Sequence, residues 1–274
     1  MKKYLSITGY VVFYLAAVFA ISIAVGKVWL GGWLPKSLTD RNYDLVVFIS
    51  FVLVLSLFAI VFKARNKSLF KTCNFSRLGT GNFMLVLAGG ILMGAFTCCI
   101  CNTSFVIKNI PIFEQSLTYQ LNGYQSFWVF LPMIAVTFSM EEMIFRGTIF
   151  NEIRSGVPVY LAVLITTAVY GLINTYSMGI AVGIYASVAA LLYNLAYVYL
   201  RSILASMILQ SASIWVIASA LRTGLWFRLG ESGDGWMMAA AAVFMLSIII
   251  LYRFIYTAGK TREAVRGASV TAHT

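Results

Sequence analysis

The sequence predicts an all-α polytopic membrane protein with about eight transmembrane helices and with both termini on the cytoplasmic side. Of its 274 residues, 61% are hydrophobic and only 11% are charged, whereas soluble domains contain about 25% charged residues. The apolar residues occur in runs of about 20, which is the length of a helix that crosses a bilayer. Lys and Arg gather between these runs, mostly on one side of the expected membrane.

The expected membrane spans are distributed along the whole chain. The first run stays as a membrane helix, because it is longer than the core of a signal peptide and no A-x-A-type cleavage site follows it. The fifth and sixth runs are separated only by a few residues around NTYSMG, which predicts a tight hairpin. We therefore expect a single transmembrane domain over residues 1–274, with a short cytoplasmic tail from about 257 to 274. The spans are expected near 4–26, 45–62, 83–101, 127–145, 158–175, 179–200, 203–220 and 236–252.

The orientation follows from the basic residues. With the N-terminus inside, fourteen of the 20 Lys and Arg residues lie in inside segments and six lie outside, a bias typical of cytoplasmic loops. The protein is therefore expected in the cell (cytoplasmic) membrane as a multi-pass protein. The outside residues are Lys27, Lys36, Arg41, Lys108, Arg222 and Arg228. The inside residues are Lys2, Lys3, Lys63, Arg65, Lys67, Lys71, Arg77, Arg146, Arg154, Arg201, Arg253, Lys260, Arg262 and Arg266.

Composition also argues against several function classes. The net charge of +11 is not arranged in one stripe, so nucleic acid is not an expected partner. The only histidine, His273, is next to the end of the sequence, so a metal site with histidine ligands is nearly excluded, and no metal or cofactor is expected. Cys98, Cys99 and Cys101 are interpreted as small packing residues, and a disulfide among them stays open. The expected partners are the lipid bilayer and a membrane protein or peptide.

The stretch FSMEEMIFRG, residues 138–147, places charges at the end of the fourth apolar run. Charged side chains at membrane depth are costly and usually functional. Glu142 and Arg146 are four residues apart on a helix, with the acid first, so they are predicted to form a structural ion pair. Glu141 is about 100° away around the helix and is not part of this ion pair. It is the candidate for proton transfer.

A second interpretation places all three charges at the cytoplasmic interface, where Arg146 extends into the headgroups and Glu141 is solvated. Polar residues in later spans favour an internal site over this interfacial interpretation. Asn194 and Gln210 come from two further spans, and amides in spans often only join helices. A free carboxylate with amides from separate helices can instead line one polar pocket.

The string EEMIFR resembles the E-E-x-x-x-R motif of the CAAX protease and bacteriocin-processing family, also called CPBP or Abi, whose members are intramembrane glutamic endopeptidases. The resemblance implies eight spans, with this motif on the fourth. In the family the first Glu activates a water that attacks a peptide carbonyl, a role that falls here on Glu141. Glu142 and Arg146 match the second Glu and the Arg.

The two later motifs of the family depart from its pattern. YGLIN matches the F-x-x-x-H motif, with Tyr170 in place of Phe and Asn174 in place of His. In LRSILASMILQSASI, the third motif places Gln210 at the second His and Ile214 at the last position. The resemblance therefore implies Glu141, Asn174 and Gln210 as the catalytic positions, and Phe145, Tyr170 and Ile214 as lining residues.

Three hypotheses of function follow. Because Asn174 cannot accept and return a proton, the first hypothesis is lost or weakened proteolysis, with binding of a membrane peptide or protein partner. The second is an active endopeptidase in prenyl-type, bacteriocin or self-immunity processing, with Glu141 as the sole base. The third is a proton-coupled transporter that uses Glu141 as a relay. Broken helices do not recur in matching halves of the sequence, which argues against the transporter.

Overall fold

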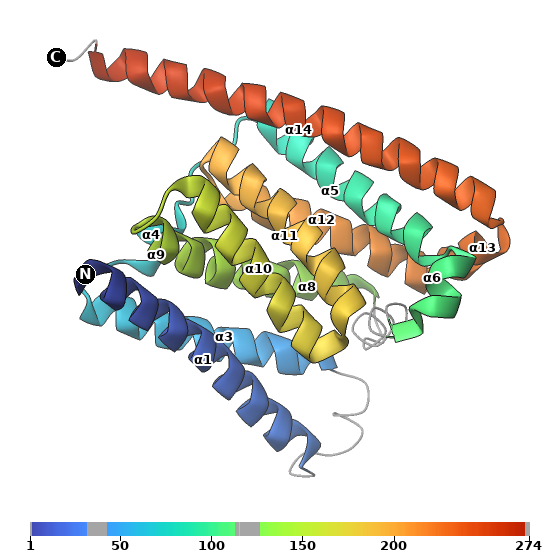
Figure 1. Ribbon diagram of the computed structural model, residues 1–274, viewed down its shortest axis with the longest axis horizontal. Helices are drawn as coiled ribbons and strands as arrows, with labels where there is room; N and C mark the ends of the chain where they lie inside the picture. Colours follow the sequence, from blue (N-terminus) through green and yellow to red (C-terminus); the bar gives the residue numbers. More distant parts are fainter. Residues whose placement is uncertain (1, 32–42, 113–114, 116–126, 272–274) are drawn as a thin grey trace.

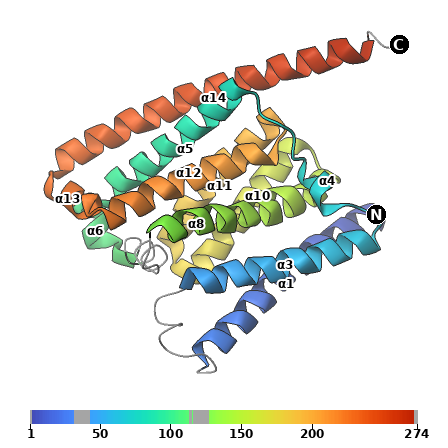
Figure 2. The same cartoon turned by 180° about the vertical axis from the view of Figure 1, so that it is seen from behind.

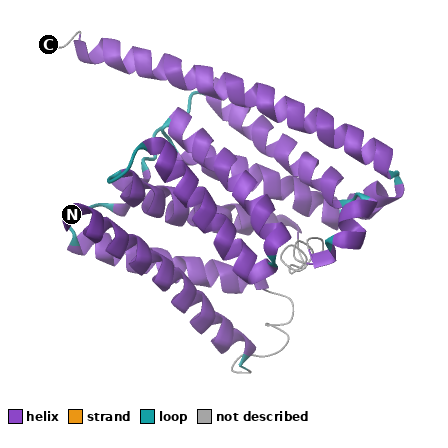
Figure 3. Ribbon diagram, viewed as in Figure 1, coloured by secondary structure: helices purple, strands orange, loops and turns teal. Residues whose placement is uncertain are grey.

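The computed structural model describes residues 2–31, 43–112, 115 and 127–271, and within these ranges it contains helices and no strand (Figure 3). Seven of the described helices are long and apolar enough to cross a membrane. They correspond to seven of the eight expected spans. In lipid a helix is favoured because it satisfies every backbone polar group internally, and the predicted polytopic α-helical class is confirmed.

The long helices lie alongside one another and run between the two ends of the molecule (Figures 1 and 2). α1 and α3 form one edge of the bundle, α5 and α14 form the opposite edge, and the remaining long helices lie between them. The short helices α4 and α9 lie at the same end as both termini, whereas α6 and α13 lie at the other end, as both views show (Figures 1 and 2). The long helices are α1 (Lys2–Leu30), α3 (Tyr43–Ala64), α5 (Thr80–Cys101), α8 (Phe127–Glu142), α10 (Val159–Met178), α11 (Ile180–Leu200), α12 (Ile203–Arg222) and α14 (Asp234–Thr271). The short ones are α4 (Leu69–Cys73), α6 (Ser104–Asn109), α9 (Asn151–Arg154) and α13 (Leu225–Glu231).

The fourth span differs from a simple helix. α8 has 16 residues, which is short for a membrane crossing, and it continues directly into a π-helix, η1 (Met143–Phe150). The expectation that a regular α-helix continues through Arg146 is therefore wrong, because the helix widens immediately after Glu142. All eight residues of η1 are buried. The charged stretch thus lies inside the bundle and not on its surface.

The tight hairpin expected between the fifth and sixth spans is confirmed. Gly179 alone joins α10 to α11, with φ of 90°, a backbone conformation that favours glycine. The two helices touch closely at Gly171 and Gly183, because a Cβ at Gly171 would clash with Gly183 O and the Ser187 side chain. Small residues at such crossings let membrane helices approach.

The C-terminal segment is helical. α14 continues to Thr271, through the residues from about 257 onward that are expected to form the cytoplasmic tail. A helix of 38 residues is much longer than the roughly 20 residues that cross a bilayer. Its C-terminal part extends past the neighbouring helices (Figure 1).

An ion-pair cluster joins three elements at the end where both termini lie. Glu152 on α9 is 3% exposed and accepts hydrogen bonds from both terminal nitrogens of Arg65, at 2.5 Å and 3.3 Å. Arg65 also donates to the Tyr14 hydroxyl of α1 at 2.9 Å and lies 3.5 Å from the centre of the Tyr10 ring. Lys67 Nζ lies 3.6 Å from Glu152 Oε1. The cluster therefore holds the edge formed by α1 and α3 against the rest of the bundle.

Replacing the central acid should loosen this edge. We expect Glu152→Gln to lower the free energy of unfolding by about 2 kcal/mol, because Arg65 then keeps its charge in a mostly buried place without a counter-charge. Unfolding of the protein in detergent micelles measures the change. Arg154→Gln, on the same short helix but exposed, is the control and should change stability by less than about 0.5 kcal/mol. Equal effects of the two variants would contradict the role of the cluster.

Candidate functional site

The Glu141 carboxylate receives a hydrogen bond on each of its oxygens. The Tyr170 hydroxyl of α10 donates to Oε1 at 2.9 Å, and Gln210 Nε2 of α12 donates to Oε2 at 2.7 Å. Tyr170 and Gln210 are 7% and 2% exposed, whereas Glu141 itself is partly exposed. Three helices that are distant in sequence therefore meet at one carboxylate. The structure brings together Glu141 and Gln210, two of the three sequence-predicted catalytic positions.

The third predicted position, Asn174, takes a different arrangement. Its side-chain amide donates to the Tyr170 carbonyl oxygen at 2.9 Å, one turn back in the same helix. The Asn174 amide therefore donates within α10, and the Glu141 carboxylate is contacted from this helix by Tyr170. Tyr170 was expected only to line the pocket. Its position matches the Phe of the second motif, which has no hydroxyl to donate.

The ion pair expected from helical spacing is present and fully enclosed. Arg146 donates to Glu142 Oε1 at 2.9 Å, and both side chains are 0% exposed. The interpretation in which Arg146 extends into the headgroups is therefore wrong, because its side chain is enclosed by protein. A buried pair needs further hydrogen bonds to offset its loss of hydration.

Other groups surround the Arg146 guanidinium. Its Nε donates to Asn194 Oδ1 at 3.2 Å, and a terminal nitrogen donates to the Ala190 carbonyl oxygen at 3.3 Å, both from α11. The rings of Tyr170 and Tyr193 lie 4.9 Å and 5.3 Å from its central carbon, which adds cation–π attraction. Arg146 thus connects η1 to α10 and α11, and it borders the same tyrosine that contacts Glu141.

The π-helix changes how the charged stretch is held. Asn151 Nδ2 donates to the carbonyl oxygens of Arg146 and Gly147, at 3.1 Å and 3.0 Å, and to Thr72 O of α4 at 2.9 Å. A side chain therefore supplies hydrogen bonds to carbonyl oxygens of the widened turn. Short π-helical segments are frequent at functional sites. In this chain the segment follows directly after the Glu141–Glu142 pair.

The three residues predicted to line the pocket, Phe145, Tyr170 and Ile214, belong to two different apolar clusters. The Phe145 and Tyr170 rings meet edge to face, with centroids 4.9 Å apart, in one cluster of buried side chains. Ile214 packs with a different apolar cluster, which contains Ile134 and Ile217. The structure therefore brings Phe145 and Tyr170 together, and it places Ile214 apart from them.

Several buried polar atoms near the site have no hydrogen-bond partner among the described residues. They are Gln210 Oε1, Ser213 Oγ and Glu142 Oε2. Gln210 and Ser213 lie three residues apart on α12, so they face the same side of that helix. Buried polar groups are usually paired. The amide oxygen and the hydroxyl are therefore buried without a partner among the described residues.

Sequence reasoning missed two parts of this arrangement. Asn194 stood out as a polar residue in an apolar span, but no spacing rule joins α11 to Arg146. The π-helix has no sequence signature in the EEMIFR stretch. In the described part of the chain, no group of three His, Cys, Asp or Glu side chains is placed to hold a metal ion. The four cysteines are buried and none of them belongs to a disulfide, including the three of the CCIC run.

Comparison with known proteins identifies the region that carries the site. Residues 123–216 match the family model described as type II CAAX prenyl endopeptidase Rce1-like. The match covers about a third of the chain and contains Glu141, Tyr170, Asn174, Asn194 and Gln210. No curated protein and no solved structure matches the chain at a significant level. The resemblance expected from the EEMIFR motif is therefore confirmed for this region: the chain is a polytopic membrane protein whose residues 123–216, which contain Glu141, are similar to the Rce1-like type II CAAX prenyl endopeptidases.

Proposed function

We propose that peptidase activity in this CPBP-type protein is lost or strongly weakened, and that the protein binds a segment of a membrane peptide or protein at the Glu141 site. The observation that carries the proposal is the pair of hydrogen bonds to Glu141. One comes from the Tyr170 phenol and the other from the Gln210 amide. The resemblance expects a histidine at position 210. We place the protein in the cytoplasmic membrane of the cell, with both termini inside.

Peptide hydrolysis needs a proton to reach the leaving amine after water has attacked the carbonyl. A histidine commonly accepts and returns such a proton, whereas the amides of Asn174 and Gln210 can only donate or accept hydrogen bonds. Loss of a general acid or base typically slows a reaction by about 10²–10⁴-fold. Glu141 alone then has to perform both proton transfers while two donors hold its oxygens.

Binding, in contrast, is supported by the groups that remain. Gln210 Oε1 and Ser213 Oγ are buried without a partner among the described residues, so they can pair with the backbone of an incoming peptide. Glu141 is partly exposed, which leaves a side from which a ligand can reach the site. A hydrogen bond that stays unmade in a buried site is costly. These groups therefore favour a ligand that carries its own amide groups.

Cleavage and binding can be separated in one preparation. The purified protein in liposomes receives a fluorogenic CAAX-type peptide and a short transmembrane reporter. We expect cleavage to be indistinguishable from that of Glu141→Ala, whereas the reporter binds to the wild-type protein and binds about tenfold more weakly to Gln210→Ala. Asn174→Gln keeps an amide at the other motif position and serves as the matched control. Rapid wild-type cleavage that Glu141→Ala abolishes would exclude the proposal.

Restoring the motif tests whether only the chemistry changed. We expect Asn174→His combined with Gln210→His to gain cleavage of the same reporters over the wild type, by up to about 10²-fold. The combined variant Asn174→His, Gln210→His, Glu141→Ala should lose that gain. If the double-histidine variant folds and binds the reporter but gains no cleavage, the site is not a protease scaffold that lacks only its histidines.

An active endopeptidase is the second candidate function, because Glu141 is retained and is partly exposed beside two hydrogen-bond donors. Gln210 Nε2 can then stabilise negative charge on the attacked carbonyl oxygen, as amides do in oxyanion holes. The cleavage assay separates the two candidates. Activity that requires Glu141 and that falls by about 10²–10³-fold in Gln210→Ala supports this second function.

A further inference from the structure

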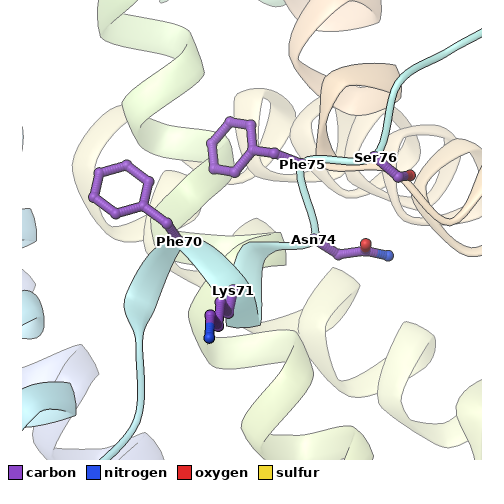
Figure 4. Close-up of a pocket in the computed structure, with 5 residues that line it drawn as sticks. All are labelled: Phe70, Lys71, Asn74, Phe75 and Ser76. Carbon is purple, nitrogen blue, oxygen red and sulfur yellow. The ribbon is translucent and has the colours of Figure 1, made fainter.

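The connection between α3 and α5 holds two aromatic side chains outside the membrane spans. α3 ends at Ala64 and α5 begins at Thr80, and the short helix α4 lies between them. Phe70 on α4 is 64% exposed and Phe75 just after it is 41% exposed, with ring centroids 6.0 Å apart. Figure 4 shows the two rings on the same side of the connection, whereas the Lys71 side chain extends in another direction. Large aromatic side chains are therefore presented at one end of the bundle.

The connection is fixed in place and is not a loose loop. Asn74 Nδ2 and Ser76 Oγ both donate to the Arg201 carbonyl oxygen, at 2.7 Å and 2.6 Å. The amide of Ile203 donates to Asn74 O at 3.2 Å. Below the exposed face, Cys73 is fully buried. These hydrogen bonds fix the backbone of the connection against the start of α12. The Phe70 and Phe75 rings are therefore exposed as part of the folded structure.

A shallow, open surface depression of about 510 Å³ lies at this connection, lined by Phe70, Lys71, Asn74, Phe75 and Ser76. The segment from Lys63 to Gly79 holds five basic residues and no acidic one. Arg65 and Lys67 pair with Glu152 of α9, whereas Lys71 is exposed beside the two rings. The charge is therefore complementary to an anion, and the aromatic rings are complementary to hydrocarbon.

We propose that the α3–α5 connection is a binding site for an acidic phospholipid of the adjoining leaflet. Lys71 attracts the phosphate of the headgroup, and Phe70 and Phe75 insert among the upper parts of the acyl chains. A soluble anion accounts for the lysine but not for the two exposed rings. Clusters of basic residues directly after a membrane helix attract anionic lipid, and aromatic side chains are enriched at the membrane–water interface. The site also contacts the end of η1, because Thr72 O of α4 accepts a hydrogen bond from Asn151, which directly follows η1.

Native mass spectrometry of the full chain in detergent, titrated with phosphatidylglycerol or phosphatidylcholine, tests the site. We expect Lys71→Gln to weaken phosphatidylglycerol binding about fivefold, and Phe70→Ala with Phe75→Ala to weaken it about tenfold or more. Phosphatidylcholine binding should be unchanged by Lys71→Gln.

Matched variants at the opposite end of the bundle are the controls. Lys108→Gln removes an exposed lysine of α6, and Phe105→Ala with Phe227→Ala removes rings that are 66% and 58% exposed. These variants should leave phosphatidylglycerol binding within twofold of wild type. Equal losses at both ends would overturn the proposal. So would binding of a soluble poly-glutamate peptide that depends on Lys71 but not on the two rings.

Discussion

Glu142→Ala is expected to lower the free energy of unfolding by about 3–5 kcal/mol, because it leaves the Arg146 charge buried without its partner. Both side chains are 0% exposed and are joined at 2.9 Å. The remaining contacts of Arg146, with Asn194 and Ala190 of α11, carry no negative charge. Thermal or denaturant unfolding in detergent micelles measures the effect.

Two further variants show whether the buried charge is the cause. Glu231→Gln removes an exposed acid and should change stability by less than about 0.5 kcal/mol. Replacing the whole pair, with Glu142→Leu and Arg146→Met, should recover much of the loss, since apolar groups of similar size can substitute for a buried ion pair. A double variant as unstable as Glu142→Ala would mean that the pair itself is not the source of the effect.

Gly94→Ala should destabilise the protein by about 3 kcal/mol, although alanine is the better helix former. An added Cβ at Gly94 would lie 2.5 Å from the Ser213 carbonyl oxygen and 2.6 Å from Val216 Cβ of α12. Backbone on both helices has to move to remove this overlap. The same micelle unfolding assay measures the change.

The matched control for this variant lies on the same helix. Gly81 also belongs to α5, and a Cβ there meets no atom within 4 Å. Gly81→Ala should therefore be neutral or stabilising, by up to about 1 kcal/mol. The opposite signs of the two changes are the expected result. Two destabilising alanines would show that close contact of α5 with α12 is not what position 94 requires.

Much of the fold can be read from apolar runs, because a segment in lipid has to satisfy its own backbone hydrogen bonds. The hairpin at Gly179 and the ends of most spans follow from this constraint and from turn residues. The end of α14 could not be predicted in the same way. Its polar residues after 257 look like a tail, yet the helix continues to Thr271.

For the site, local spacing was sufficient where both partners lie on one helix. The Glu142–Arg146 pair follows from a separation of four residues, and Glu141 follows as the carboxylate left over. The contacts of Glu141 with Tyr170 and Gln210 cross 29 and 69 residues of sequence. The motif resemblance indicated both positions, but only helix packing decides which side chain reaches the carboxylate.

The sequence by itself determined the membrane class, the positions of most spans, the resemblance of one region to the Rce1-like family and the identity of the glutamate outside the ion pair, because these depend on composition and on separations within one helix. The tertiary structure alone decided that Tyr170, and not Asn174, contacts Glu141 from α10, that Asn194 joins Arg146, and that the helix widens after Glu142. These outcomes depend on how far apart the helix axes lie and how each helix is rotated about its axis. Such quantities result from the summed packing of many side chains, and no local pattern encodes them.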